Sequence, residues 1–127
     1  METCFRILGA LHLMYGAVLF GILVDALKED SGIELPRAQW GIKAVLLLAE
    51  VSLLLICGCA ALLLEPSAFA YALLALVACF LVAFSDTVAL RGPRALVDLP
   101  PGFYLHVAIQ GIAASALFVL APAVAGT

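Results

Sequence analysis

Apolar residues dominate the chain in four long runs, which short polar segments separate. The runs cover roughly residues 5–24, 41–64, 68–90 and 103–124. Each run is close to the ~20 residues that a helix needs to cross the ~30 Å hydrocarbon layer of a bilayer. A helix is the expected structure, because it satisfies its own backbone hydrogen bonds within lipid. The pattern predicts one all-α domain over residues 1–127, an integral membrane, up-and-down bundle of four transmembrane helices.

The segments between the runs contain residues that end helices or favour membrane interfaces. Residues 26–40 form the longest segment and hold several charged side chains, and Trp40 stands at its end, where interfacial aromatic residues are common. Residues 64–67 are short enough to form only a tight turn. Residues 99–102 include two prolines directly before the fourth run. These breaks favour antiparallel neighbours along the whole chain.

The composition supports a membrane location. Hydrophobic residues make up 66% of the chain and charged residues only 12%, and the mean hydropathy is +1.23. Soluble domains carry roughly a quarter charged residues, and a chain of this size has too much surface to bury so many apolar residues. We therefore expect a multi-pass protein with the lipid bilayer as its surroundings (the cell membrane, or the inner membrane if the source is bacterial). The net charge of -3 and the lack of a basic run or glycine-rich phosphate loop argue against nucleic-acid and nucleotide binding.

The lysines and arginines predict an orientation in the membrane. Five of the six flank the first and third connections: Lys28, Arg37, Lys43, Arg91 and Arg94. The other side of the membrane holds only Arg6. The positive-inside rule then places both longer loops in the cytoplasm and both termini outside.

Small residues recur on the third run at the spacing of a helix-packing seam. The small or polar positions are Ala68, Ala72, Ala75, Cys79, Val82 and Asp86. We predict that the centre of this seam, formed by Ala72, Ala75 and Cys79, packs inside the bundle, because small side chains let membrane helices approach closely. Two further small-x-x-x-small pairs, Ala17 with Gly21 and Gly111 with Ser115, indicate either a tight bundle or contact with another subunit.

The four cysteines do not form a recognisable site in the sequence. Cys4, Cys57, Cys59 and Cys79 include no C-x-x-C pair and no zinc-type spacing with histidine. We interpret those within the apolar runs as small packing residues. From the sequence we predict no metal site, no cofactor and no catalytic residue.

Glu50 is the one charged residue in the middle of the second run. A charge at the bilayer centre costs at least ~2.5 kcal/mol, so Glu50 is a functional candidate, with a hydrogen-bond clasp between helices and a subunit contact as alternatives. Counting 1.5 Å per residue places Tyr15 and Gln110 near its depth, with His12 and His106 above and below. These five residues are the candidates for a ligand or proton site. The two histidines differ in depth by roughly 13 Å, which argues against one haem held by both.

Several short motifs resemble those of DoxX-like membrane proteins, which are small four-helix proteins. The matching positions are Glu50, Gly58 and residues 61–64 in the second run, Arg6 and Gly16 in the first, and residues 99–103 before the fourth. Phe20 and Gly21 stand near the position where that family usually has a lysine. The resemblance implies association with membrane redox systems, often as an accessory subunit, and it does not imply a defined catalytic site.

Three functions remain open at this level, and the first is favoured. It is a non-catalytic accessory subunit of a larger membrane complex, with a membrane-protein partner or a second copy of the chain. The alternative is a small-molecule or proton-coupled transporter or binder that uses Glu50 for a lipophilic or cationic ligand; residues 49–51 look like the glutamate segment of small multidrug resistance transporters. An enzyme acting on a lipid or quinone through Glu50 and Tyr15 has no supporting motif, so the sequence favours a protein that is not an enzyme.

Overall fold

Four helices make up the computed structural model of the chain, which describes the backbone of residues 1–28, 37–91 and 101–125. They are α1 (Glu2–Lys28), α2 (Arg37–Leu62), α3 (Ala68–Arg91) and α4 (Pro101–Ala125). Side chains are described for residues 1–24, 44–82, 84 and 104–125. The all-α prediction is confirmed for these parts of the chain. The charged loop of residues 29–36 and most of the cationic residues behind the predicted orientation lie outside the described residues.

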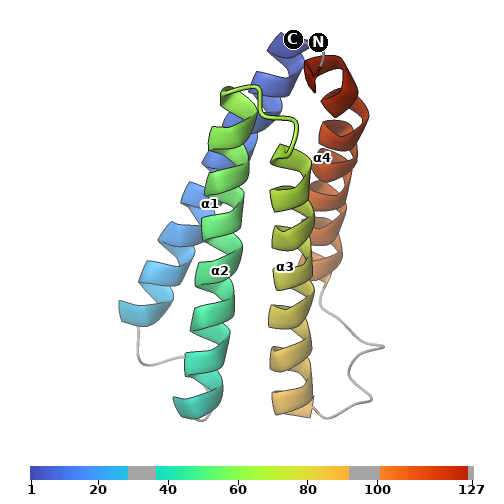
Figure 1. Ribbon diagram of the computed structural model, residues 1–127. Coiled ribbons are helices and arrows are strands. Elements are labelled where there is room, and N and C mark those ends of the chain that lie inside the picture. Colours follow the sequence, from blue (N-terminus) through green and yellow to red (C-terminus); the bar gives the residue numbers. More distant parts are fainter. Residues whose placement is uncertain (29–36, 92–100, 126–127) are drawn as a thin grey trace.

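Successive helices run in opposite directions and form a bundle. Both chain ends and the turn between α2 and α3 lie at the same end of the molecule (Figure 1). Helix α1 packs on α2, α2 on α3 and α3 on α4, and α4 returns to contact α1. Side chains from neighbouring helices therefore meet inside the bundle wherever their depths agree.

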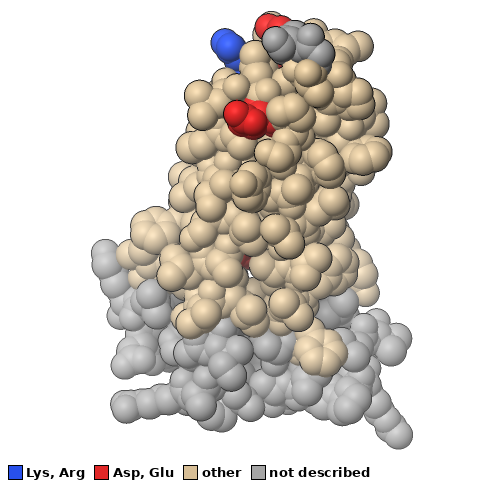
Figure 2. All heavy atoms as spheres, in the orientation of Figure 1, with Lys and Arg blue, Asp and Glu red and all other residues tan. Residues whose placement is uncertain are grey.

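Three of the helices are long and apolar enough to cross a membrane. The stretches are Glu2–Val24, Ala44–Leu62 and Tyr104–Ala125. The described side chains of α3 form a shorter apolar stretch, Ala68–Val82. Large apolar side chains cover much of the outer surface, including Met14, Ile112 and Val119. In Figure 2 the described part of the face is mostly uncharged; charged atoms gather near the end that holds the termini, and a little red shows in a hollow farther down.

A close contact joins α1 to α2 through small residues. A Cβ atom built on Gly9 would lie 2.8 Å from the Cβ of Ala61 and 2.9 Å from the carbonyl oxygen of Gly58. A Cβ on Gly58 would lie 2.7 Å from the carbonyl oxygen of Gly9. The two backbones thus touch with no room for a side chain, which is how small residues bring membrane helices together. The sequence pattern did not predict this contact.

The predicted seam of α3 faces the interior. Ala72, Ala75 and Cys79 are buried, with exposed fractions of 2%, 0% and 3%. Ala72 belongs to an apolar cluster that also contains Cys57 and Leu117. Side chains from α2, α3 and α4 therefore share one core.

The two other small-residue pairs do not pack the bundle together. Ala17, Gly21 and Ser115 are exposed, and Gly111 is only partly buried. A Cβ atom added at Gly21 or at Gly111 would meet nothing within 4 Å. Of the two interpretations of these pairs, a tight bundle within this chain is therefore wrong.

Helix α2 ends at Leu62, two residues before the predicted boundary at residue 64. Leu64 has a φ of 60°, a left-handed conformation that cannot continue the helix. The N–H of Glu65 donates to the carbonyl of Ala60 at 2.8 Å, and the N–H of Leu64 donates to the carbonyl of Ala61 at 3.1 Å. This pair of bonds is the Schellman arrangement, which satisfies carbonyls at the helix end. It fixes the sharp reversal into α3.

Candidate functional site

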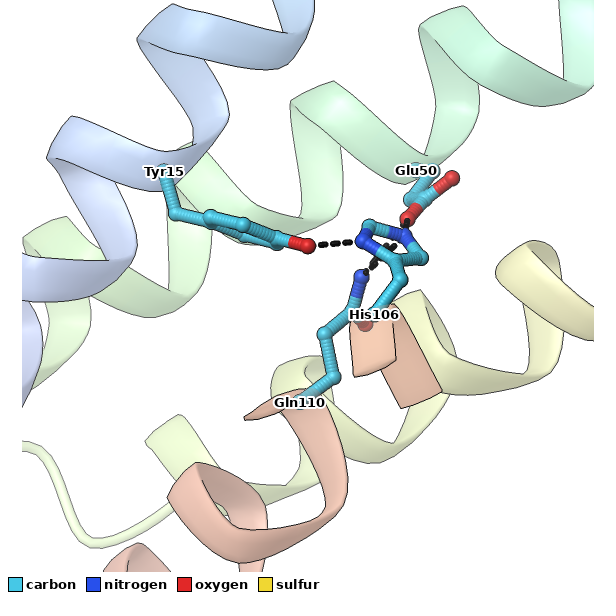
Figure 3. A network of polar contacts seen from close by, with 4 residues as sticks. All are labelled: Tyr15, Glu50, His106 and Gln110. Atoms are coloured by element: carbon cyan, nitrogen blue, oxygen red, sulfur yellow. Dashed lines mark hydrogen bonds and ion pairs between the residues drawn. The ribbon is translucent and has the colours of Figure 1, made fainter. Parts of the chain in front are cut away.

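Four polar side chains from three helices converge inside the bundle (Figure 3). Tyr15 comes from α1, Glu50 from α2, and His106 and Gln110 from α4. His106 and Gln110 are four residues apart, so they lie on one face of α4. Tyr15, Glu50, His106 and Gln110 are called the polar cluster below.

The contacts at Glu50 are short. Gln110 Nε2 donates to Glu50 Oε1 at 2.6 Å, and His106 Nε2 lies 2.7 Å from the same oxygen. The two nitrogen atoms are themselves 2.9 Å apart. One oxygen and two nitrogens thus lie within hydrogen-bond distance of one another.

The imidazole of His106 is bonded at both of its nitrogens. The Tyr15 hydroxyl is hydrogen-bonded to Nδ1, on the opposite side of the ring from Glu50. The two rings are also stacked at a tilt, with centroids 5.2 Å apart. Because both nitrogens are held, the ring has a fixed orientation between α1 and α2.

The three contacts that meet at this point cannot all be ordinary hydrogen bonds at the same time. A single imidazole nitrogen either donates or accepts, and an amide nitrogen only donates. If His106 Nε2 donates to Glu50, it cannot also accept from Gln110. If it accepts from Gln110, the contact with Glu50 requires a proton on the carboxyl group. The donors and acceptors of the cluster therefore do not match, and a shared proton or a bound cation would resolve the mismatch.

The cluster is largely shielded. Glu50 is 1% exposed and Gln110 is 3% exposed, whereas the His106 side chain keeps 20% of its surface. Among the described residues the Oε1 atom of Gln110 is buried and has no hydrogen-bond partner. Arg6, at the exposed N-terminal end of α1, is the one arginine or lysine whose side chain is described. The described part of the site consists of groups that carry lone pairs.

His12 is the candidate that the cluster does not include. It is 4% exposed, and its Nδ1–H donates to the carbonyl oxygen of Leu8 at 2.7 Å. A carbonyl can only accept, so this bond settles which nitrogen carries the proton. The bond stays within α1, which is the ordinary state of a buried histidine.

The position of His106 differs from the one predicted by residue counting. The count placed it on the loop side of Glu50, yet its ring contacts Glu50 directly. The ends of long side chains can lie several residues' rise away from the level of their own backbone. A count of backbone rise ignores this reach.

Cys79 lies beside the cluster, and the sequence analysis assigned it to packing alone. Its sulfur, a carboxylate oxygen of Glu50 and a ring nitrogen of His106 all lie within 4.8 Å of one another. The depth count used for Tyr15 would also have placed Cys79 at a depth that differs from that of Glu50 by only roughly 3 Å. The sequence therefore indicated that the depths match, but it did not show that the side chain of Cys79 points toward Glu50.

The chain matches no protein-family model, and no curated protein or solved structure shows significant similarity to it. The resemblance to DoxX-like proteins therefore stays a prediction. The functional evidence in this chain is the polar cluster. Its lone pairs can hold a cation, and an imidazole bonded on both sides can pass a proton from one nitrogen to the other.

Proposed function

We propose that the protein is an integral membrane protein of four transmembrane helices that binds a cationic ligand at Glu50. The observation that carries the proposal is the burial of Glu50, at 1% exposed, against His106 and Gln110 of another helix. An intramembrane carboxylate with partners on facing helices is a common feature of ion and substrate sites. This is the binder that the sequence analysis held as its alternative.

The membrane part of the proposal rests on the outer surface. Val45, Ile112 and Val119 are between 66% and 72% exposed. Such surface is costly in water, at about 25 cal/mol per Å², and costs nothing against lipid tails. Helix α3 packs between α2 and α4, so it spans the bilayer with them and makes the fourth crossing.

The cationic ligand follows from the chemistry of the cluster. A carboxylate, an imidazole nitrogen and an amide oxygen all present lone pairs, and no lysine or arginine is described beside them. A cation or a strong hydrogen-bond donor would satisfy the buried oxygen of Gln110 that has no described partner. An anion would meet only like charge at Glu50.

Cation binding should raise the thermal stability of the full chain in mild detergent. The probes are tetraphenylphosphonium, magnesium chloride and zinc chloride, each added separately. A ligand present at 100 times its dissociation constant stabilises the folded state by about 2.7 kcal/mol. We expect one of these probes to do so in the wild type and not in Glu50→Gln. Glu65→Gln, which changes an exposed carboxylate, is the matched control, and an equal response in all three proteins would refute the proposal.

We also propose that both termini lie outside and that the two longer loops lie in the cytoplasm. The support is the excess of lysine and arginine around these loops. In a cysteine-free background, an impermeant maleimide added to intact cells should label Thr3→Cys and leave Ser31→Cys unlabelled. The reverse pattern would invert the orientation.

A second candidate is the accessory subunit of a larger membrane complex, with the redox association that the DoxX-like resemblance implies. It is favoured by the exposed pairs Ala17 with Gly21 and Gly111 with Ser115, which present small residues on the outside of the bundle. Such surfaces suit close contact with another membrane helix. Purification in mild detergent followed by mass spectrometry should then recover a partner. A monodisperse protein without one would argue against this candidate.

A further inference from the structure

Three side chains of metal-binding type meet at the polar cluster, each from a different helix. Glu50 belongs to α2, Cys79 to α3 and His106 to α4, and their ligand atoms lie within 4.8 Å of one another. We propose that these three residues bind a divalent transition-metal ion of the kind that prefers thiolate and imidazole, such as Zn²⁺. The inference rests on the proposed function, because it names the cation that the Glu50 site takes.

The distances are close to those of a tetrahedral site. Bonds of ~2.0–2.3 Å from zinc to oxygen, nitrogen and sulfur place neighbouring ligand atoms about 3.5 Å apart. The contact between Glu50 Oε1 and His106 Nε2 is shorter than that, at 2.7 Å, and the widest separation in the group is below 4.8 Å. An ion is therefore accommodated by small side-chain movements, in which the first pair opens and Cys79 moves inward.

The charges balance. A divalent ion bound by one carboxylate, one thiolate and a neutral imidazole gives a complex with no net charge. Within a low-dielectric interior an unpaired charge is very costly, whereas a compensated one is tolerated. The binding of such an ion would also explain why a carboxylate is kept in the middle of an apolar helix.

Gln110 supplies the fourth ligand. Its Oε1 atom is buried without a partner among the described residues, while its Nε2 atom lies 2.6 Å from Glu50 and 2.9 Å from His106. Turning the amide by half a rotation exchanges oxygen and nitrogen at almost no change in shape. The oxygen then takes the position among the ligand atoms, where its lone pairs face a bound ion together with those of Glu50 and His106.

Tyr15 completes the surroundings of the site. Histidines that bind metals through one nitrogen usually hold a hydrogen bond at the other, which orients the ring. The Tyr15 hydroxyl does this at Nδ1 of His106, so Nε2 is directed toward Glu50. Access is available beside His106, whose side chain is 20% exposed.

The ligand set selects among metals. A thiolate with an imidazole favours zinc, copper or iron, whereas magnesium and calcium prefer oxygen ligands alone. The sequence offered no such prediction, because the residues come from three helices and have no local spacing. Cys79 decides between this inference and the broader proposal, since a hard or lipophilic cation would need Glu50 but not the thiol.

The test uses the full chain in mild detergent, stripped of metal with a chelator and titrated with Co²⁺ as a coloured substitute for zinc. Cys4 and Cys59 are exposed, so both are replaced by serine to prevent adventitious binding. We expect a thiolate-to-cobalt charge-transfer absorption that saturates at one equivalent and disappears when Zn²⁺ is added.

Two variants assign the ligands in this background. Cys79→Ser should abolish the charge-transfer absorption and weaken cobalt binding by at least roughly tenfold. Glu50→Gln, which keeps the side-chain shape, should also weaken it. Cys57→Ser changes the other buried cysteine and should leave the absorption intact. Circular dichroism and the elution profile establish that each variant is folded.

The outcomes separate the two proposals. An absorption that persists in Cys79→Ser, or the absence of zinc-displaceable cobalt binding in the background protein, overturns the metal site. If tetraphenylphosphonium or Mg²⁺ still stabilises the protein only when Glu50 is present, the proposed function stands without the metal. If no probe gives a response that depends on Glu50, both proposals fall.

Discussion

Replacing Glu50 with leucine should destabilise the bundle more than any other single change in the polar cluster. The substitution removes the oxygen that Gln110 and His106 both contact, and it leaves these two side chains only each other as partners on that side. A buried polar group without a partner costs ~1–3 kcal/mol, so the N–H of Gln110 that loses its acceptor makes the loss measurable by thermal or denaturant unfolding in detergent. The expected result is a lower midpoint of unfolding, with the helical content unchanged at temperatures or denaturant concentrations below that midpoint.

Two controls identify the cause of that loss. Glu50→Gln keeps the shape and one acceptor oxygen, so it should retain most of the stability while losing the charge needed for a cation. The combined replacement of Glu50, His106 and Gln110 by leucine and of Tyr15 by phenylalanine removes all partners together. It should recover much of the stability, because replacing a whole set by apolar groups can be nearly neutral. If this combined variant is less stable than Glu50→Leu alone, the explanation by unpaired groups is wrong.

Adding a single methyl group at Gly58 should separate α1 from α2. In Gly58→Ala the new Cβ would lie 2.5 Å from Leu13 Cγ and 2.7 Å from the carbonyl oxygen of Gly9. The leucine can move, but the backbone oxygen moves only if its helix does. Overpacking of this kind costs ~1–3 kcal/mol, which exceeds the gain of up to about 1 kcal/mol from a better helix former.

The matched control for this change is Gly111→Ala, where an added Cβ meets nothing within 4 Å. Here the gain in helix propensity should appear alone, so this variant should be as stable as the wild type or slightly more so. The comparison requires only unfolding midpoints in one detergent. Equal midpoints for Gly58→Ala and Gly111→Ala would show that the α1–α2 contact is looser than described.

The presence of the four helices was predictable, because it depends on local properties. Four apolar runs of membrane-spanning length predicted α1 to α4, and the structure has a helix at each. The errors are at the ends: α2 stops at Leu62 because Leu64 adopts a left-handed conformation. The backbone angle of one residue in a turn is not visible in a hydrophobic pattern.

Glu50 was also identifiable from the sequence alone, as were Tyr15 and Gln110 at its depth. A charge inside an apolar run is conspicuous whatever surrounds it, and depth follows from the constant rise of a helix. Both arguments need only the sequence and the rise per residue of a helix.

The tertiary structure alone decided which side chains meet. The spacing of small residues indicated the inward face of α3. Nearly every position of these helices is apolar, however, and the same spacing did not separate the buried contact of Gly9 and Gly58 from the exposed Gly21. His106 reaches Glu50 while His12 turns back to its own helix, and Cys79 joins them from α3. The rise along the axis is a property of a single helix, so depth can be calculated from the sequence. The rotation of each helix about that axis, and the reach of its side chains, are set by packing against the other three.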